Sequence, residues 1–387
     1  MTNDELSQRF AEIYGGQPEA IASAPGRVNI IGEFTDYNNG FVLPCALEFR
    51  TQVAYRQRSD NSIVAHSLQY PGQKDEFPVD RVIEPGTNQW GNYVRAVAFI
   101  IETMGVKLGG MDLLIESNVP QGAGLSSSAA LEVAVGGAIN AAFNLGFSPT
   151  ELAQIGQSAE NDFMNCQCGI MDQLVSACGQ RDNALLIDCL DLTTQLATMP
   201  GDLVLLIINS NYPRKLVDSE YNDRREDCQA AADAMQVSSL RDADLSALEG
   251  AKTRLTDTQY RRAKHVITEN QRVLDALDAL RNSHIETLST LMAASQMSLR
   301  NDFEVTVPAT DWIVDKCTSI VGKKGAARQT GGGFGGAVVC LCQSESVEDI
   351  TRKIEVEYPK ATGLHADIFR CVAGDGLSIT PRNHTSS

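Results

Sequence analysis

Short apolar runs recur along the chain and predict buried strands. They lie at residues 41–46 (FVLPCA), 111–115 (MDLLI), 203–208 (LVLLII) and 338–341 (VVCL). Runs of this length between turn-forming residues are typical of strands in a sheet core. The third run follows a Met-Pro-Gly sequence at 199–201, which interrupts regular structure. We therefore predict a domain boundary there, with an N-terminal domain over residues 1–199 and a C-terminal domain over residues 200–387.

Other stretches have the pattern of helices. Residues 129–144 are mostly small and apolar, and residues 253–298 place Leu and Val among interspersed charges with helical spacing, as in solvated helices that cover a core. The sequence SPTE at 148–151 has the order of an N-cap, a first-turn proline and a capping box, which predicts a helix through about Met164. Strands and helices together indicate an α+β fold.

Length and charge narrow the class of protein. A chain of 387 residues exceeds the usual size of one hydrophobic core, so two domains with a cleft between them are expected. The net charge of −17 repels phosphate backbones and anionic lipid surfaces, which argues against nucleic acid and membranes as partners. The first ten residues carry two acids and lack the apolar segment of a secretory signal. We expect a cytoplasmic protein, with a monomer favoured.

The cysteines give no sign of disulfides or zinc. Ten of them are spread along the chain without paired C-x-x-C units, and no histidine lies near those at positions 166, 168 and 178. We expect reduced and mostly buried thiols.

The first candidate for chemistry is the segment at residues 24–38, APGRVNIIGEFTDYN. It places Arg27, Glu33, Asp36 and Tyr37 around two glycines. Ionised carboxylates accept hydrogen bonds, and every hydroxyl of a polyol can donate one, so this density suits a sugar site. The alternative is ordinary turn chemistry, which also favours Asp and Asn beside glycine.

A second candidate is the glycine- and serine-rich segment at 120–131, PQGAGLSSSAAL, which runs directly into the helix predicted from residue 129. Glycines let backbone N–H groups approach a phosphate, and a helix N-terminus favours an anion. The segment is not a Walker A loop, because no Gly-Lys-Ser/Thr follows, and the His-Arg-Asp and Asp-Phe-Gly signatures of protein kinases are absent. It predicts a phosphate-binding loop.

Two further segments contain candidate residues. In the region 160–178, Glu160 is a candidate ligand for Mg²⁺, and Asp172 lies among apolar residues, where a buried acid needs a partner such as Arg27. The segment at 328–337, RQTGGGFGGA, allows close backbone contact with a ligand or a tight turn. It does not fit a dinucleotide fingerprint, because the predicted strand follows the glycines instead of preceding them.

Taken together, these segments resemble the motifs of the GHMP kinases. The three family motifs correspond to residues 25–37, 120–131 and 330–336, in order and at suitable spacing. Residues 168–174 (CGIMDQL) and 209–225 (NSNYPRKLVDSEYNDRR) resemble the galactokinases more than the mevalonate or homoserine kinases. The resemblance covers roughly residues 10–375. It implies a two-lobed α+β fold with the site between the lobes, galactose and Mg-ATP as reactants, and galactose 1-phosphate and ADP as products.

The resemblance also implies roles for individual residues. Asp172 matches the catalytic carboxylate, and Arg27 matches the arginine that steadies charge beside it. Ser128 and Glu160 match the positions that bind Mg²⁺. The expected sugar-binding residues are Glu33, Phe34, Thr35, Asp36, Gly169, Asp172 and Tyr221, and the expected phosphate loop is Gly122, Ala123, Gly124, Leu125, Ser126, Ser127 and Ser128.

Two alternatives to galactose phosphorylation stay open at this point. One is a kinase for a related sugar, because galactokinases usually read Gly-Glu-His-Thr-Asp-Tyr and this chain has Phe34 at the histidine position. The other is a sensor that binds galactose and ATP without turnover. Such sensors lose residues of the Ser-Ser-Ser-Ala-Ala segment, whereas Ser128, Ala129, Ala130 and Asp172 are all present here.

Overall fold

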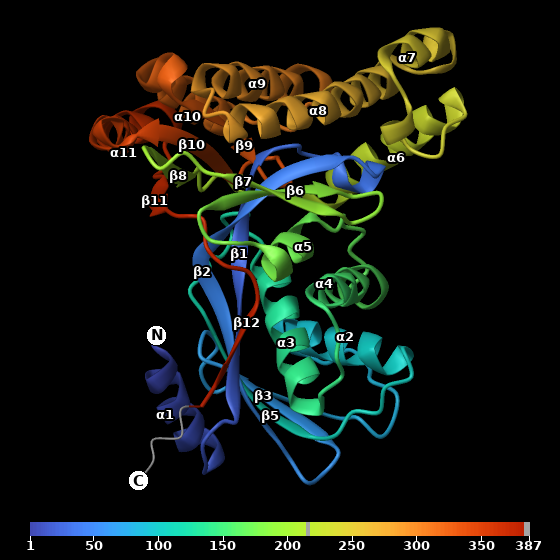
Figure 1. Ribbon diagram of the computed structural model, residues 1–387, viewed down its shortest axis with the longest axis vertical. Helices are drawn as coiled ribbons and strands as arrows, with labels where there is room; N and C mark the ends of the chain where they lie inside the picture. Colours follow the sequence, from blue (N-terminus) through green and yellow to red (C-terminus); the bar gives the residue numbers. More distant parts are fainter. Residues whose placement is uncertain (214–216, 383–387) are drawn as a thin grey trace.

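The computed structural model describes residues 1–213 and 217–382. Two sheets organise the chain into two lobes, and Figure 1 shows the C-terminal lobe above the N-terminal lobe. The larger sheet has the order β12-β1-β2-β5-β3-β4, and β6 pairs with both β2 and β7. Its strands are β1 (Ala20–Ile31), β2 (Phe41–Gln57), β3 (Ser62–Ser67), β4 (Lys74–Pro78), β5 (Met111–Ser117), β6 (Asn183–Asp188), β7 (Thr194–Thr198) and β12 (Ser378–Pro381).

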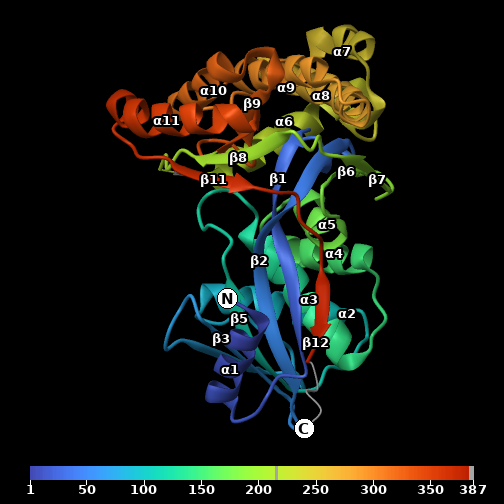
Figure 2. The same cartoon turned by 60° about the vertical axis from the view of Figure 1, so that its left-hand side comes forward.

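The smaller sheet forms the floor of the C-terminal lobe and has the order β11-β8-β10-β9 with antiparallel pairing. Its strands are β8 (Leu203–Asn209), β9 (Ala326–Thr330), β10 (Ala337–Gln343) and β11 (Asp367–Cys371). After β11 the chain returns to the N-terminal lobe, where β12 runs alongside β1 (Figure 2). The boundary proposed at residue 199 stays a prediction.

The helices of the N-terminal lobe are α1 (Asn3–Tyr14), α2 (Gln89–Thr103), α3 (Ser127–Phe143), α4 (Pro149–Ser158) and α5 (Met171–Cys178). Helices α2 to α5 cover one face of the larger sheet, and α1 packs on its other face (Figure 2). The helices of the C-terminal lobe are α6 (Val217–Met235), α7 (Leu245–Ala251), α8 (Asp257–Arg281), α9 (Ile285–Ser298), α10 (Pro308–Val321) and α11 (Val347–Thr362). Figure 1 shows α8 and α9 side by side across the top of the C-terminal lobe.

The strands and helices predicted from apolar patterning are confirmed. The four apolar runs lie in β2, β5, β8 and β10, the small-residue stretch lies in α3, and residues 253–298 contribute α8 and α9. Ser148 caps α4 with the predicted capping box. The helix then continues as a π-helical turn, η2 (Ala159–Phe163), with Met164 as its C-cap. Local capping and periodicity therefore decided these elements.

The strand β1 joins the two cores. Every residue of β1 is buried, because the lower part packs under the helices of the N-terminal lobe and the upper part packs against the C-terminal lobe. One apolar cluster combines residues of β1 and β2 with residues of β8, β10, α8 and α9. The end of β1 is consequently held at the junction between the lobes.

Two further expectations can be compared with the structure. All ten cysteines are free thiols, and most of them are buried. Within the described ranges, no helix combines the length and the apolar character that crossing a bilayer requires.

Candidate active site

A cavity of about 270 Å³ lies where the end of β1 faces the start of α5, and we call it the carboxylate cavity. Nearly all the residues predicted for sugar binding and catalysis line it: Arg27, Glu33, Phe34, Asp36, Gly169, Asp172 and Tyr221. Thr35 is the exception among them. Its hydroxyl is fully buried and donates to the backbone oxygens of Gly32 and Phe41, which holds the turn after β1.

Arg27 and Asp172 meet at the edge of this cavity. The β1–β2 register shifts between Pro25 and Arg27, and irregularities of this kind re-aim a side chain out of the strand pattern. The guanidinium of Arg27 donates from Nε to Oδ1 of Asp172 at 2.7 Å and from Nη2 to Oδ2 at 2.8 Å. Asp172 lies in the first turn of α5. This two-pronged contact fixes both groups in one geometry.

The same pair contacts the glycine- and serine-rich loop. Nη1 of Arg27 donates to the Gly124 oxygen at 2.7 Å, and the Ser126 hydroxyl donates to Oδ2 of Asp172. Gly26 has no room for a side chain, because an added Cβ would lie 2.5 Å from the Leu125 oxygen. The catalytic candidates and the phosphate-loop candidates therefore form one connected unit.

The loop itself exposes backbone where an anion could be held. Gly122 and Gly124 both have φ of 73° and Ser126 has φ of 60°, while the side chains of Ala123 and Leu125 are buried and anchor the segment. The helix α3 starts at Ser127, and the Ser126 side chain makes no capping bond. The first N–H groups of α3 are thus left for a ligand, as at known phosphate sites.

Asp36 lines the same cavity as Asp172 and requires the glycine at 169. A Cβ added to Gly169 would lie 1.9 Å from Oδ2 of Asp36. Burial, and then the negative charges of Asp172 and Glu33, raise the pKa of Asp36 to about 6, while a hydrogen bond from the Tyr37 backbone and the charge of Arg27 oppose the increase. At neutral pH Asp36 is mainly ionised and can accept hydrogen bonds from hydroxyl groups.

Glu33 is held by the glycine-rich segment after β9. Its Oε1 accepts from the Gly331 backbone N–H at 2.9 Å and from Nη1 of Arg328 at 3.3 Å. Gly331 has φ of 84°, and an added Cβ would lie 3.3 Å from the Gly124 oxygen. The segment that was ambiguous in sequence therefore lies against both Glu33 and the phosphate loop.

Aromatic rings form another wall of the carboxylate cavity. Phe34 has φ of 65°, is buried, and stacks on Phe303 with ring centroids 4.6 Å apart. The Tyr221 ring of α6 lies 6.0 Å from the Phe34 ring and 5.5 Å from the Tyr37 ring. From the signature at 209–225, Tyr221 and Asn222 line the cavity, while residues 214–216 lie outside the described part of the chain.

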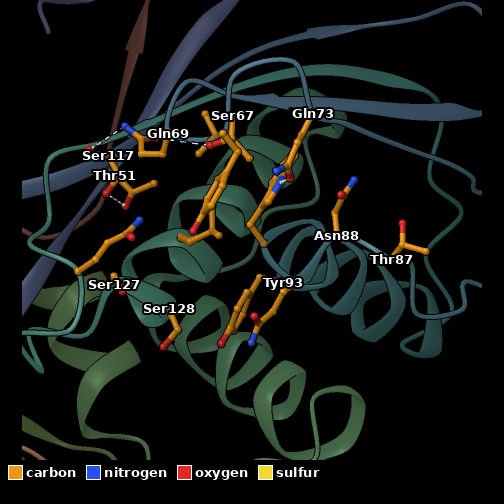
Figure 3. Close-up of a pocket in the computed structure, with 16 residues that line it drawn as sticks. Thr51, Ser67, Gln69, Gln73, Thr87, Asn88, Tyr93, Ser117, Ser127 and Ser128 are labelled. Atoms are coloured by element: carbon orange, nitrogen blue, oxygen red, sulfur yellow. Dashed lines mark hydrogen bonds between the residues drawn. The ribbon is translucent and has the colours of Figure 1, made fainter. Parts of the chain in front are cut away.

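A second cavity, of about 530 Å³, reaches the other side of the phosphate loop, and we call it the aromatic cavity. Ser127 and Ser128 line it from the start of α3, and Figure 3 shows their side chains at one end of a hollow with Tyr93 and Asn88 farther along. Its described lining contains no charged side chain. The rings of Tyr70 and Trp90 stack in it with centroids 6.2 Å apart and planes within 6°.

Sequence reasoning missed the aromatic cavity. Trp90 Nε1 donates to Oε1 of Gln73 at 3.0 Å; Trp90 lies in the first turn of α2 and Gln73 between β3 and β4, in sequence that carries no motif. The only sequence signal for this cavity was an aromatic residue among amide and hydroxyl side chains, and that pattern is common on protein surfaces.

Glu160, a predicted Mg²⁺ ligand, lies in η2 and is buried beside a carboxyl that sequence reasoning also missed. Glu132 follows Ser128 by one turn of α3 and accepts from Nε2 of Gln173 at 3.0 Å. Burial, followed by the negative charge of Glu160, raises the pKa of Glu132 well above its usual value. An acid inside the apolar run of α3 was the sequence signal for it.

The described residues contain no cluster of three or more His, Cys, Asp or Glu side chains suited to a metal ion. A site built from Ser128 and Glu160 therefore stays a prediction.

Comparison with known proteins decides the family. The model of the GHMP kinase N-terminal domain matches residues 92–180, that of the GHMP kinase C-terminal domain matches residues 276–360, and the galactokinase galactose-binding signature matches residues 8–57. The galactokinase of Lactococcus lactis, solved with galactose, is 31% identical with a TM-score of 0.93, over 97% of this chain and 99% of that one. The chain belongs to the galactokinase family.

More distant kinases share the fold. The mevalonate kinase of Methanococcus jannaschii is 16% identical with a TM-score of 0.61, over 92% of this chain and 98% of that chain. The homoserine kinase of Cytophaga hutchinsonii is 16% identical with a TM-score of 0.62, over 94% and 98%. The resemblance to GHMP kinases and the α+β fold predicted from the sequence are both confirmed.

Proposed function

We propose that the protein transfers the γ-phosphoryl group of ATP to the anomeric hydroxyl of galactose. The observation that carries this proposal is the junction of Arg27, Asp172 and Ser126, which connects the carboxylate cavity to a phosphate-binding loop. Phosphoryl transfer requires a positioned hydroxyl and neutralisation of charge more than covalent help from the protein. Membership of the galactokinase family, with its galactose-binding signature, supports galactose as the acceptor.

The carboxylate cavity is the proposed sugar site. Glu33 and Asp36 accept hydrogen bonds from sugar hydroxyls, and the rings of Phe34 and Tyr221 provide apolar walls for the C–H faces of the sugar. Backbone at Gly169 leaves the space that Asp36 occupies. Thr35 contributes by holding the turn that carries Phe34 and Asp36.

Asp172 and Arg27 act on the reacting hydroxyl in this proposal. Asp172 accepts the hydrogen bond of the anomeric hydroxyl and receives its proton as the oxygen attacks the γ-phosphorus and the bond to ADP breaks. Arg27 stabilises the negative charge that develops on the transferred phosphoryl group, and its two hydrogen bonds to Asp172 keep that carboxylate in place.

The aromatic cavity is the proposed site of the nucleoside part of ATP. A base has an aromatic face that stacks on rings such as Tyr70 and Trp90, and it has edges that bond to amides and hydroxyls. Ser127 and Ser128 line the same cavity at the start of α3, where the phosphates would reach the loop. In this proposal, the base and the phosphates of ATP both bind to residues of the N-terminal lobe.

Mg²⁺ is proposed to bind at Ser128 and Glu160, directly or through water, and there it would neutralise the phosphates of ATP. A hydroxyl and a buried carboxylate are oxygen donors of the kind that Mg²⁺ prefers. We expect Glu160→Gln to raise the Mg²⁺ concentration for half-maximal activity much more than the KM for galactose. Equal increases in both would contradict metal binding by this carboxylate.

The reaction itself is tested by phosphorus NMR on the protein mixed with Mg-ATP and galactose. The proposal predicts a new anomeric phosphate signal together with ADP. If ATP binds and no sugar phosphate forms, the chain is a sensor of galactose and ATP instead.

A related sugar is a second candidate substrate, and Phe34 is the observation that favours it. A phenyl ring cannot make the hydrogen bonds of the imidazole usual at this position. A panel of galactose, N-acetylgalactosamine and arabinose, compared by kcat/KM, separates the two candidates.

A further inference from the structure

Arg328 is a fully buried cation that the proposed reaction does not yet use. It lies on β9 of the C-terminal lobe, where its Nη1 is 3.2 Å from the Ile30 oxygen, 3.3 Å from the Asn29 oxygen and 3.3 Å from Oε1 of Glu33. Its Nε and Nη2 have no hydrogen-bond partner within the described ranges. A guanidinium in such surroundings is costly to bury, and an apolar side chain of similar size would usually pack there at lower cost.

Glu33 is the counter-charge of this arginine. Among the described residues, no other carboxylate lies within 4.0 Å of the Arg328 guanidinium. Glu33 is itself 3% exposed, so the two charges are removed from water together. A charge pair that is buried in this way fixes the orientation of its members more than it stabilises the fold.

The two oxygens of Glu33 have different surroundings. Oε1 is engaged by the Arg328 guanidinium and by the Gly331 backbone N–H. Oε2 has no hydrogen bond to any described residue, and Glu33 lines the carboxylate cavity. The side chain is thus anchored through one oxygen and keeps the other for a ligand.

We propose that Arg328 is a positioning residue for sugar binding: it holds Glu33 by Oε1 so that Oε2 accepts a hydrogen bond from a sugar hydroxyl. The inference rests on the proposed function of the carboxylate cavity. Glu33 follows β1, whereas Arg328 and Gly331 belong to β9 and the loop after it, so the sugar site is completed by contact between the lobes.

Another buried carboxylate, Glu269, does not need Arg328 as its partner. Glu269 of α8 is held by Arg272 at 2.6 Å, by the Ser295 hydroxyl at 2.6 Å and by the Gly32 backbone N–H at 3.0 Å. It therefore has its own partners. The carboxylate of Glu33 is bonded by Arg328 and Gly331 alone among the described residues.

A double-mutant cycle tests the proposal, with KM for galactose, KM for ATP and kcat measured for each variant. We expect Arg328→Met to raise KM for galactose about tenfold, the loss of roughly one charge-assisted contact, with KM for ATP within about twofold. In a Glu33→Gln background the same change should have less than about a twofold effect, because the group it positions has lost its charge. Arg328→Lys should restore part of the affinity.

The control is Arg56→Met, which removes an ion pair to the equally buried Asp112 at the far side of the N-terminal lobe. It should lower Tm and leave both KM values unchanged. Equal effects of Arg328→Met in the two backgrounds would overturn the proposal, and so would parallel shifts in both KM values. If neither Arg328→Met nor Arg328→Lys folds, the arginine is structural and the proposal fails. Failure of the wild type to phosphorylate galactose would instead overturn the proposed function.

Discussion

The carboxylate cavity presents Glu33, Asp36 and Asp172 to a ligand, whereas the described side chains of the aromatic cavity are hydroxyls, amides, aromatic rings and aliphatic groups. Both cavities reach the loop at residues 122–128, the first through Arg27 and the second through Ser127 and Ser128. The difference fits the proposed ligands, because a sugar is recognised by its many hydroxyls, while a base is recognised by stacking and by its polar edge.

The charged residues of the carboxylate cavity interact with one another, whereas the uncharged residues described in the aromatic cavity do not share such charge–charge interactions. In the carboxylate cavity, burial and then the negative charges of Asp172 and Glu33 raise the pKa of Asp36 to about 6, while Arg27 acts in the opposite direction. Each of these groups therefore depends on its neighbours for its position. The aromatic cavity has no such coupling, so substitutions there should act one at a time and on ATP alone.

The largest effect is expected from Asp172→Asn. The change keeps the shape of the side chain and removes the charge that we propose contacts the reacting hydroxyl, which should lower kcat by about 10² to 10³, or ~3 to 4 kcal/mol. Asp188→Asn is the matched control, because Asp188 makes the same two-pronged contact with Arg241 at 2.9 Å but lines neither cavity. A folded Asp172→Asn enzyme with more than a third of wild-type turnover would falsify the assignment.

A smaller effect is expected from Gly169→Ala. The added methyl group would displace Asp36, because a Cβ there lies 1.9 Å from its Oδ2. A misfit of this kind costs about 1–3 kcal/mol, so KM for galactose should rise roughly tenfold or more while KM for ATP stays constant. Gly201→Ala is the control, since nothing lies within 4 Å of its added Cβ. An unchanged galactose KM would show that Asp36 does not contact the sugar.

Trp90→Ala tests the other cavity. Loss of a stacking surface for a base is worth about 1–3 kcal/mol, so KM for ATP should rise about tenfold with no change in KM for galactose. The chain contains one other tryptophan, Trp312, which packs on Tyr358 in the C-terminal lobe and provides the control Trp312→Ala. A shift in galactose KM comparable to that in ATP KM would mean that the two cavities are not independent.

The smallest effect is expected from Phe34→His, which adds a polar group to the apolar wall of the carboxylate cavity. One hydrogen bond to a neutral hydroxyl contributes about 0.5–1.5 kcal/mol, so kcat/KM for galactose should rise by roughly tenfold at most. For the deoxy sugar that lacks the hydroxyl facing residue 34, kcat/KM should not rise. The stack of Phe34 on Phe303 limits the space for this change. Equal changes for galactose and all its deoxy analogues would contradict a role for Phe34 in specificity.

Much of the site could be predicted from the sequence because its chemistry is local or charged. Apolar runs and one capping box specified strands and a helix, and glycines before a helix start specified the phosphate loop. The pairing of Arg27 with Asp172 was also predictable across 145 positions, because an acid among apolar residues requires a cation.

What the sequence by itself determined is therefore the strands of the four apolar runs, the helices with clear periodicity or capping, and the charged groups that line the carboxylate cavity. Only the tertiary structure decided how they are completed. It directed the hydroxyl of Thr35 toward backbone oxygens and placed Arg328 of the C-terminal lobe beside Glu33. It also assembled the uncharged aromatic cavity around Trp90. The physical reason is that neutral side chains bind by shape, and shape arises from the packing of segments that are far apart in the chain.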